Sequence, residues 1–185
     1  KVEDPTLRAQ LLDIATHDVR RIDRLVTEIS DASRIDAEMS RTEFEPVDLA
    51  QLLCTIVESR EARDENEGRT LEITGADRPA RVMGGPVRRE RVIQNLLDNA
   101  VSFSPPAGRI WADLSRRDDW ITLTICDEGP GIPEEKREKV FRRFHSDRPA
   151  EEDFGNHSGL GLAIARTIAE AHDGTLVAPP RMTAQ

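Results

Sequence analysis

The run Ile121-Thr122-Leu123-Thr124-Ile125-Cys126-Asp127-Glu128-Gly129-Pro130-Gly131 carries the pattern that decides the fold. It is an apolar, strand-like stretch that ends in an acidic residue and a Gly-x-Gly turn. Strand side chains alternate between two faces, so Asp127 continues the apolar row of Ile121, Leu123 and Ile125. A carboxylate at the edge of an apolar layer needs hydrogen-bond donors, and glycines let the backbone approach a ligand closely. The pattern suits a purine amino group bound by Asp127, although an ordinary Asp-Gly turn has the same sequence.

A second stretch, residues 88–103, has the periodicity of an amphipathic helix, with Ile93, Leu96, Leu97 and Ala100 at i, i+3, i+4 and i+7. Asn95 and Asn99 are four residues apart and therefore lie one above the other on one helix face. Asn inside a helix costs up to about 0.7 kcal/mol relative to Ala, so two of them require a reason. An amide oxygen is a hard ligand that suits Mg²⁺ beside phosphates. A solvated polar face is the simpler alternative.

A third stretch, residues 155–165, is a glycine-rich turn that opens a helix expected to reach about His172. Its apolar face consists of Leu160, Ile164, Ile168 and Ala171. Free backbone amides and the positive end of the helix dipole make such a turn a phosphate site. It is not the dinucleotide fingerprint, because a polar stretch rather than a strand precedes it.

In this order, the three stretches resemble the ATP-binding domain of bacterial sensor histidine kinases, within the Bergerat-fold (GHKL) superfamily. Residues 95–99 match the N box, 127–131 the G1 box, 140–144 the F box and 159–161 the G2 box. The resemblance covers roughly residues 43–178 and implies an α/β two-layer sandwich, with one mixed sheet covered on one face by helices. Residues 31–38, 143–149 and 155–162 are most similar to alphaproteobacterial envelope-stress and acid-sensing kinases of the ChvG/ExoS type.

The resemblance implies ATP and Mg²⁺ as ligands and a role for each matching residue. Asp127 would bind the adenine amino group, Asn99 and Asn95 would lie at the metal, and Phe103 would pack on the base. Asn95 and Arg143 are the expected catalytic residues, with Arg143 replacing a Lys that the family usually has at position 102. The other expected nucleotide contacts come from the glycine turns and the F box, namely Gly129, Gly131, Ile132, Phe144, Gly159, Leu160, Gly161 and Leu162.

The residue at position 95 separates two kinds of chemistry within the superfamily. ATP-hydrolysing relatives of the Hsp90, gyrase and MutL types have a Glu there that activates water, whereas the amide of Asn95 cannot act as a general base. The resemblance therefore implies transfer of the γ-phosphoryl group to a histidine and then to a response-regulator aspartate. A nucleotide-binding scaffold or phosphatase-supporting module without kinase chemistry is the alternative. Asn95 and the N-terminal heptad pattern disfavour the anti-sigma serine kinases.

Residues 6–41 have a heptad pattern that predicts a long bundle-forming helix, apolar at seven of the nine positions Leu11, Ala15, Asp18, Ile22, Leu25, Ile29, Ala32, Asp36 and Met39. We expect residues 1–42 to be the second helix of a dimerisation and phosphotransfer hairpin that supports a homodimer or higher self-association. Residues 41–46 form the expected hinge, and residues 43–185 the ATP-binding domain.

The phosphoacceptor is expected on a first helix that this sequence does not contain. His17 is followed by Asp18, as in the family motif, but Arg21 stands where a polar residue is expected. We therefore expect no self-phosphorylation. Residues 178–185 do not have a strand pattern where the family runs through another strand, so the domain is expected to be incomplete at its C-terminus.

The remaining pattern predicts a helix capped by Asp48 and reaching about Asn66, and strands over residues 69–74 and 80–84. A hairpin is expected from strands 109–115 and 120–127, with its turn at residues 116–119. Residues 142–158 are polar and are expected to form a mobile ATP lid, with His157 where the G2 pattern often has a glycine.

Composition agrees with a soluble, folded protein that can form a core. The chain has 185 residues, 37% hydrophobic and 33% charged, and a net charge of −9 that argues against nucleic acid as a partner. No apolar run approaches the roughly 18 residues of a membrane span, so we expect no direct membrane contact. The resemblance implies the cytoplasmic end of an inner-membrane protein. Cys54 and Cys126 lack metal-ligand spacing and are expected to be reduced thiols.

Overall fold

The structure is a computed structural model that describes residues 16, 19, 45–145 and 159–180. The expected helix over residues 6–41 lies outside this part except for Thr16 and Val19, which are both helical and exposed. Hinge residues 41–44, lid residues 146–158 with His157, and the last five residues also lie outside it. No helix in the described ranges combines the length and the apolar character that crossing a membrane requires.

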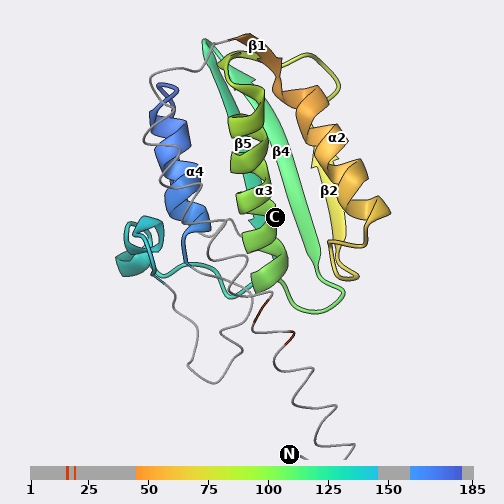
Figure 1. The fold of residues 1–185 in the computed structure, drawn as a ribbon, viewed down its shortest axis with the longest axis vertical. Helices are drawn as coiled ribbons and strands as arrows, with labels where there is room; N and C mark the ends of the chain where they lie inside the picture. The colour runs from red at the N-terminus through yellow and green to blue at the C-terminus, as the bar shows by residue number, and fades with distance from the viewer. Residues whose placement is uncertain (1–15, 17–18, 20–44, 146–158, 181–185) are drawn as a thin grey trace, which may run out of the picture.

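The described elements are five strands, three α-helices of four or more residues and two short 3₁₀ turns. They are β1 (Glu45–Asp48), α2 (Leu49–Ala62), β2 (Thr70–Thr74), β3 (Arg81–Gly84), α3 (Pro86–Phe103), β4 (Arg109–Arg117), β5 (Trp120–Asp127), two short 3₁₀ turns η1 (Glu134–Lys136) and η2 (Lys139–Phe141), and α4 (Gly161–Glu170). The three helices lie side by side over the larger sheet, with α3 between α2 and α4 (Figure 1). This arrangement confirms the expected α/β sandwich.

The described strands form two sheets, so the expectation of a single mixed sheet is wrong. β2 pairs with β4 in parallel and β4 pairs with β5 antiparallel, whereas β1 and β3 form a separate antiparallel pair. β3 takes its partner from residues 45–48, whose first two residues were expected to belong to the hinge. Val47 is buried in this segment and lies opposite Val82, which favours an extended, paired conformation.

The main core lies between α2, α3 and the three-stranded sheet. Its buried members are Leu53, Ile56, Val57, Leu71, Ile93, Leu97, Ala100, Val101, Ile110 and Ala112, with Leu123 and Ile125 packed against them. The apolar row predicted for β5 is thus the core face, and the helix periodicity predicted for residues 88–103 is confirmed. Leu160, at the N-cap of α4, packs with Ile164 and Ile168 of the helix and with Val92 of α3. Since α4 packs on α3, both glycine turns reach the same helix.

Asp48 caps α2 as expected, and it also ties the helix to β3. Its Oδ1 accepts the backbone N–H of Ala50 at 3.0 Å and that of Ala80 at 2.9 Å. The Ala80 bond, aided by the bond from Ala50, lowers the pKa of Asp48. The helix ends at Ala62 rather than near Asn66. The reason is that Asp64 and Glu67 take left-handed backbone conformations, φ 55° and 50°, which an α-helix cannot contain.

Two other element ends also differ from the sequence-based expectation. β4 continues to Arg117, and the hairpin turns at residues 118–119, where Asp118 has a left-handed φ of 53° that Asp tolerates in tight turns. α4 ends at Glu170, two residues before the expected end. Residues 171–180 form no strand; of residues 178–185, which lack a strand pattern, the last five lie outside the described part.

Candidate functional site

Asp127 ends β5 at the rim of the core, half-buried, with its carboxylate turned back on the G1 turn. Its Oδ1 accepts the backbone N–H of Gly129 at 2.7 Å. Burial raises the pKa of Asp127, and the Gly129 bond opposes that rise. A Cβ at Gly129 would lie 2.5 Å from Asp127 Oδ1 and 2.7 Å from the carbonyl oxygen of Phe103. Position 129 therefore needs glycine because a carboxylate and a helix end both approach its backbone.

The rest of the G1 turn is fixed by a residue that the sequence analysis did not single out. Glu128 accepts the backbone N–H of Arg109 at 3.0 Å and its Nε and Nη2 at 3.3 Å each. Gly131 is exposed and has φ +75°, a conformation in which other residues are strained, and Ile132 is half-buried. The arginine thus anchors the chain directly after Asp127, while Gly131 redirects it.

Asn95 and Asn99 are both half-buried on α3. The Nδ2 of Asn95 is buried and makes no hydrogen bond within the described residues. It is therefore a buried donor that lacks an acceptor in this part of the chain. A Cβ at Gly161 would lie 3.6 Å from Asn95 Oδ1, at ordinary contact distance. The first residue of α4 therefore lies against Asn95, and the structure brings the N and G2 boxes together.

Helix α3 sets the distance between the two ends of the site. The end of α3 at Phe103 contacts the G1 turn, and Asn95 contacts the start of α4. These eight residues correspond to about 12 Å along the helix axis. Asn99 lies between the two ends. Such a spacing fits an extended nucleotide, with its base at the carboxylate and its phosphates at the glycine turn.

The F box joins the G2 turn through the backbone. Phe144 donates its backbone N–H to the carbonyl of Gly159 at 3.0 Å. Gly159 has φ +70°, and a Cβ there would lie 2.8 Å from the carbonyl oxygen of His145. The side chains of Arg143 and Phe144 are exposed, and Phe103 is exposed to a smaller extent. The two ends of the lid segment are thus held together, and the expected F-box contact residues are accessible.

Arg166 on α4 holds the F-box segment from the other side. It donates to Glu138 at 2.9 Å and to Glu170 at 3.0 Å, and its guanidinium lies 5.0 Å from the ring centroid of Phe141. Phe141 is buried beneath it. The cation–π contact with Phe141 and the ion pair with Glu138 link α4 to the segment that leads into the lid, and the Glu170 pair within α4 orients the arginine.

Two expected contact residues of the G2 turn have different environments. The side chain of Leu160 is 1% exposed and packs with Ile164 and Ile168 in the core. A nucleotide contact of Leu160 would therefore go through its backbone. Leu162 is half-buried on the first turn of α4.

The donor set of the site fits Mg²⁺ with nucleotide phosphates. No cluster of three or more His, Cys, Asp or Glu side chains that could hold a metal ion occurs among the described residues. Mg²⁺ is held by few protein ligands and completes its octahedral shell with phosphate oxygens and water. The amide of Asn95 beside the start of α4, with that of Asn99 one turn further along α3, matches that mode of binding.

Comparison with known proteins assigns the family. Residues 84–184 match the family described as histidine kinase-, DNA gyrase B- and HSP90-like ATPase. The chain belongs to this family. The match covers α3, both glycine turns, the F box and α4, which are the parts that build the site.

The similar proteins are sensor histidine kinases. "Sensor protein ChvG" of Rhizobium meliloti (strain 1021) is 46% identical over 91% of this chain, which spans 30% of that protein's length. Among solved structures, the mycobacterial sensor histidine kinase MprB has a TM-score of 0.61 at 34% identity, over 72% of this chain and 83% of that one. The histidine kinase ThkA, in complex with the response regulator protein TrrA, has a TM-score of 0.73 at 24% identity, over 97% of this chain and 49% of that one; it shows the fold alone. The family and the histidine-kinase type of its ATPase domain are thus as expected.

Proposed function

We propose that the chain binds ATP with Mg²⁺ and transfers the γ-phosphoryl group to a histidine of a phosphoacceptor hairpin, and from there to the aspartate of a response regulator. The observation that carries this proposal is the placement of Asn95, with a buried unpartnered amide, against the first residue of the G2 helix. An amide there can bind but cannot activate water. The proposal extends to the whole protein, an inner-membrane sensor of which this chain is the cytoplasmic part.

Each end of the site has its own task. Asp127 accepts a hydrogen bond from the adenine amino group through the carboxylate oxygen that does not bond to Gly129. Phe103 packs on the base. Gly131 and Ile132 shape the base pocket from the G1 turn. Since both carboxylate oxygens act only as acceptors when ionised, adenine is preferred over guanine, which presents a carbonyl at the same position.

The phosphates lie along α3 towards α4. The backbone N–H groups at Gly159, Gly161 and Leu162 donate to phosphate oxygens at the positive end of the helix dipole. Asn99 and Asn95 supply amide oxygens to the metal. When bound, Mg²⁺ neutralises charge that develops between the β- and γ-phosphates. Arg143 adds a positive charge from the F box, and Phe144 covers the site beside it.

Incubation with γ-labelled ATP and a separate phosphoacceptor hairpin tests transfer. We expect acid-labile label on the hairpin histidine, dependent on Mg²⁺, and none with Asn99→Ala. The chain alone should stay unlabelled, because His17 lacks the motif. Nucleotide binding without any label on the hairpin would favour the scaffold or phosphatase-supporting alternative. Stoichiometric label on the chain alone that disappears in His17→Gln would identify His17 as the acceptor.

A further inference from the structure

Arg60 is a buried charged residue that the proposed nucleotide chemistry does not use. It lies in the last turn of α2 and is 5% exposed. Removing a guanidinium from water is costly unless its N–H groups are bonded in the fold. The bonds that Arg60 makes therefore indicate what its burial achieves.

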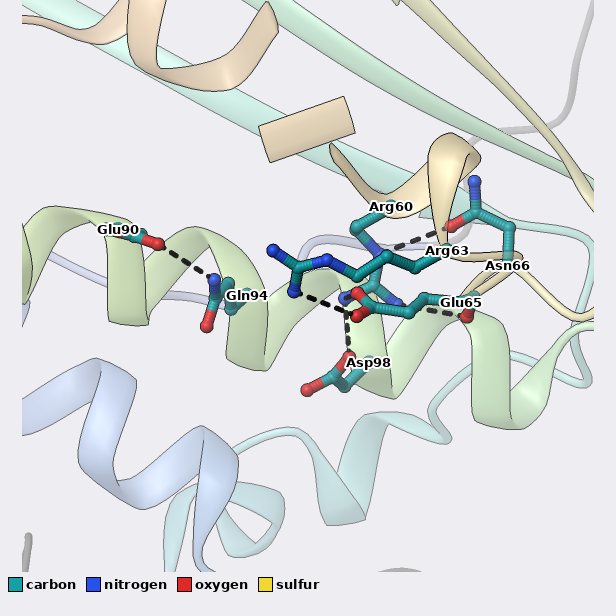
Figure 2. A network of polar contacts seen from close by, with 7 residues as sticks. All are labelled: Arg60, Arg63, Glu65, Asn66, Glu90, Gln94 and Asp98. Carbon is teal, nitrogen blue, oxygen red and sulfur yellow. Dashed lines mark hydrogen bonds and ion pairs between the residues drawn. The ribbon is translucent and has the colours of Figure 1, made fainter. Parts of the chain in front are cut away.

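Three residues from two segments accept hydrogen bonds from this one guanidinium (Figure 2). Nη1 donates to Oδ1 of Asp98 at 2.7 Å, Nε donates to Oδ1 of Asn66 at 3.2 Å, and Nη2 donates to the carbonyl of Glu65 at 3.3 Å. Asn66 is buried with it. The bond to Asp98 is the shortest of the three and the only one that reaches α3. Arg60 thus connects the end of α2 and the following turn to the helix of the N box.

Asp98 stands beside the residues proposed to hold the metal. It follows Asn95 by three positions and directly precedes Asn99. Among the described residues, α2 and α3 also share the apolar core, with members such as Leu53, Ile56 and Leu97. Apolar burial is non-directional, so it resists separation of the helices more than rotation of one against the other. The charged bond to Asp98 has a preferred distance and angle, and therefore fixes the rotation.

We propose that Arg60 is a positioning residue for the metal and phosphate end of the site, acting through Asp98 on the rotation of α3. The inference deepens the proposed function and rests on it. Side-chain tips lie about 5–6 Å from a helix axis, so a rotation of roughly 20° moves them by about 2 Å. Mg²⁺ tolerates departures from octahedral geometry poorly, whereas the base at the far end is held by Asp127 on β5.

The test compares ATP affinity with and without Mg²⁺, by titration calorimetry on the full chain. Asp98→Ala should lower the ratio of the ATP affinity with Mg²⁺ to the ATP affinity without it at least about fivefold. It should change the metal-free affinity less than about twofold. Asp98→Asn should restore most of the ratio, because an amide oxygen accepts the same bond from Nη1. A role in stability alone would lower both affinities together or neither.

Arg60→Met keeps the test decisive if Asp98→Ala does not fold. Methionine fills a similar volume without a buried charge, and Asp98, whose side chain is 56% exposed, remains solvated. The same fall in the ratio is expected. Arg63→Met is the matched control at the C-cap of α2, since Arg63 pairs with Glu65 at an exposed site. Gln94→Ala is the control on α3, where Gln94 bonds to Glu90 within the helix (Figure 2).

Nucleotide-free protein gives a second readout. The side-chain amide resonances of Asn95 and Asn99 should shift in Asp98→Ala and Arg60→Met, and stay in place in both controls. Unchanged Mg²⁺ dependence in a folded Asp98→Ala or Arg60→Met overturns the inference and leaves the proposed function standing. Wild-type protein that binds no nucleotide overturns the proposed function and the inference with it.

Discussion

At the scale of single residues, the site places polar groups where the fold alone would not favour them. Asp127 is a half-buried carboxylate whose raised pKa shows that burial disfavours its charge, and Asn95 has a buried amide nitrogen without a partner in the described chain. Both features cost stability in the ligand-free protein and are relieved by a ligand that donates to one and accepts from the other. Residues of this kind mark a binding site rather than a structural one.

Gly129→Ala should weaken nucleotide binding while most of the fold survives. The added methyl would lie 2.5 Å from Asp127 Oδ1 and 2.7 Å from the carbonyl of Phe103, so the carboxylate and the G1 turn must move apart. We expect a fall in ATP affinity of at least about tenfold, about 1.4 kcal/mol or more. Calorimetric titration measures it, with circular dichroism as the folding control. Pro130→Ala, at an exposed neighbour, is the matched variant, and an equal effect of both would contradict the steric account.

At the scale of elements, helix α4 is held at its middle and just past its end. Arg166 ties its middle to the F-box segment, and His172, just past its end, lies against the start of α3. The Nδ1 of His172 donates to the carbonyl of Ile168 at 2.7 Å, and its Nε2 accepts the backbone N–H of Gly85 at 3.4 Å. This pattern of one donor and one acceptor requires the neutral imidazole.

Acid should weaken the fold through His172. Burial lowers its pKa, and the positive charges of Arg89 and Arg88 also lower it, against the bond to Ile168 and the charge of Asp173. Because the folded pKa lies below the ordinary 6.5, the unfolded chain binds the proton first, and the free energy of unfolding falls as pH drops through 6.5. Urea unfolding from about pH 7.5 to about pH 5.5 should show a larger loss for wild type than for His172→Asn. Parallel losses would contradict this assignment.

How far the sequence predicts the fold depends on how local the signal is. The periodicity of residues 88–103, the cap at Asp48 and the carboxylate at Asp127 are visible within a few residues, and the structure confirms these elements. The contacts of Arg60 with Asp98 and of Arg109 with Glu128 join residues 38 and 19 positions apart, and no local pattern reveals them. β1 was missed because residues 45–48 become a strand only by pairing with β3.

At the scale of the whole molecule, the bundle-forming helix predicted for residues 6–41 remains a prediction. Of its expected seam, the structure describes Val19, which is helical and 65% exposed. Burying a Leu or Ile side chain contributes about 1.5–3 kcal/mol, so several such positions together favour association with other copies. Asp18 and Asp36 on the seam would keep that association modest.

Sedimentation over a range of protein concentrations tests the association. Wild type should shift towards a dimer or larger species as concentration rises, and Leu25→Glu should remain smaller because it places a charge in the seam. Thr27→Glu, on the expected outer face, should behave as wild type. A monomer at every concentration, with no effect of Leu25→Glu, would show that the seam is covered within one copy.

Asp127 is central to the proposed function because it binds the adenine amino group. A calorimetric titration of wild type and Asp127→Asn with ATP tests this role most directly. We predict one site in the wild type and a fall in affinity of at least about tenfold in the variant, because an amide can present a donor to the adenine amino group. The variant should stay folded, since its oxygen can still accept the N–H of Gly129. Equal ATP affinity in a folded Asp127→Asn would contradict the account.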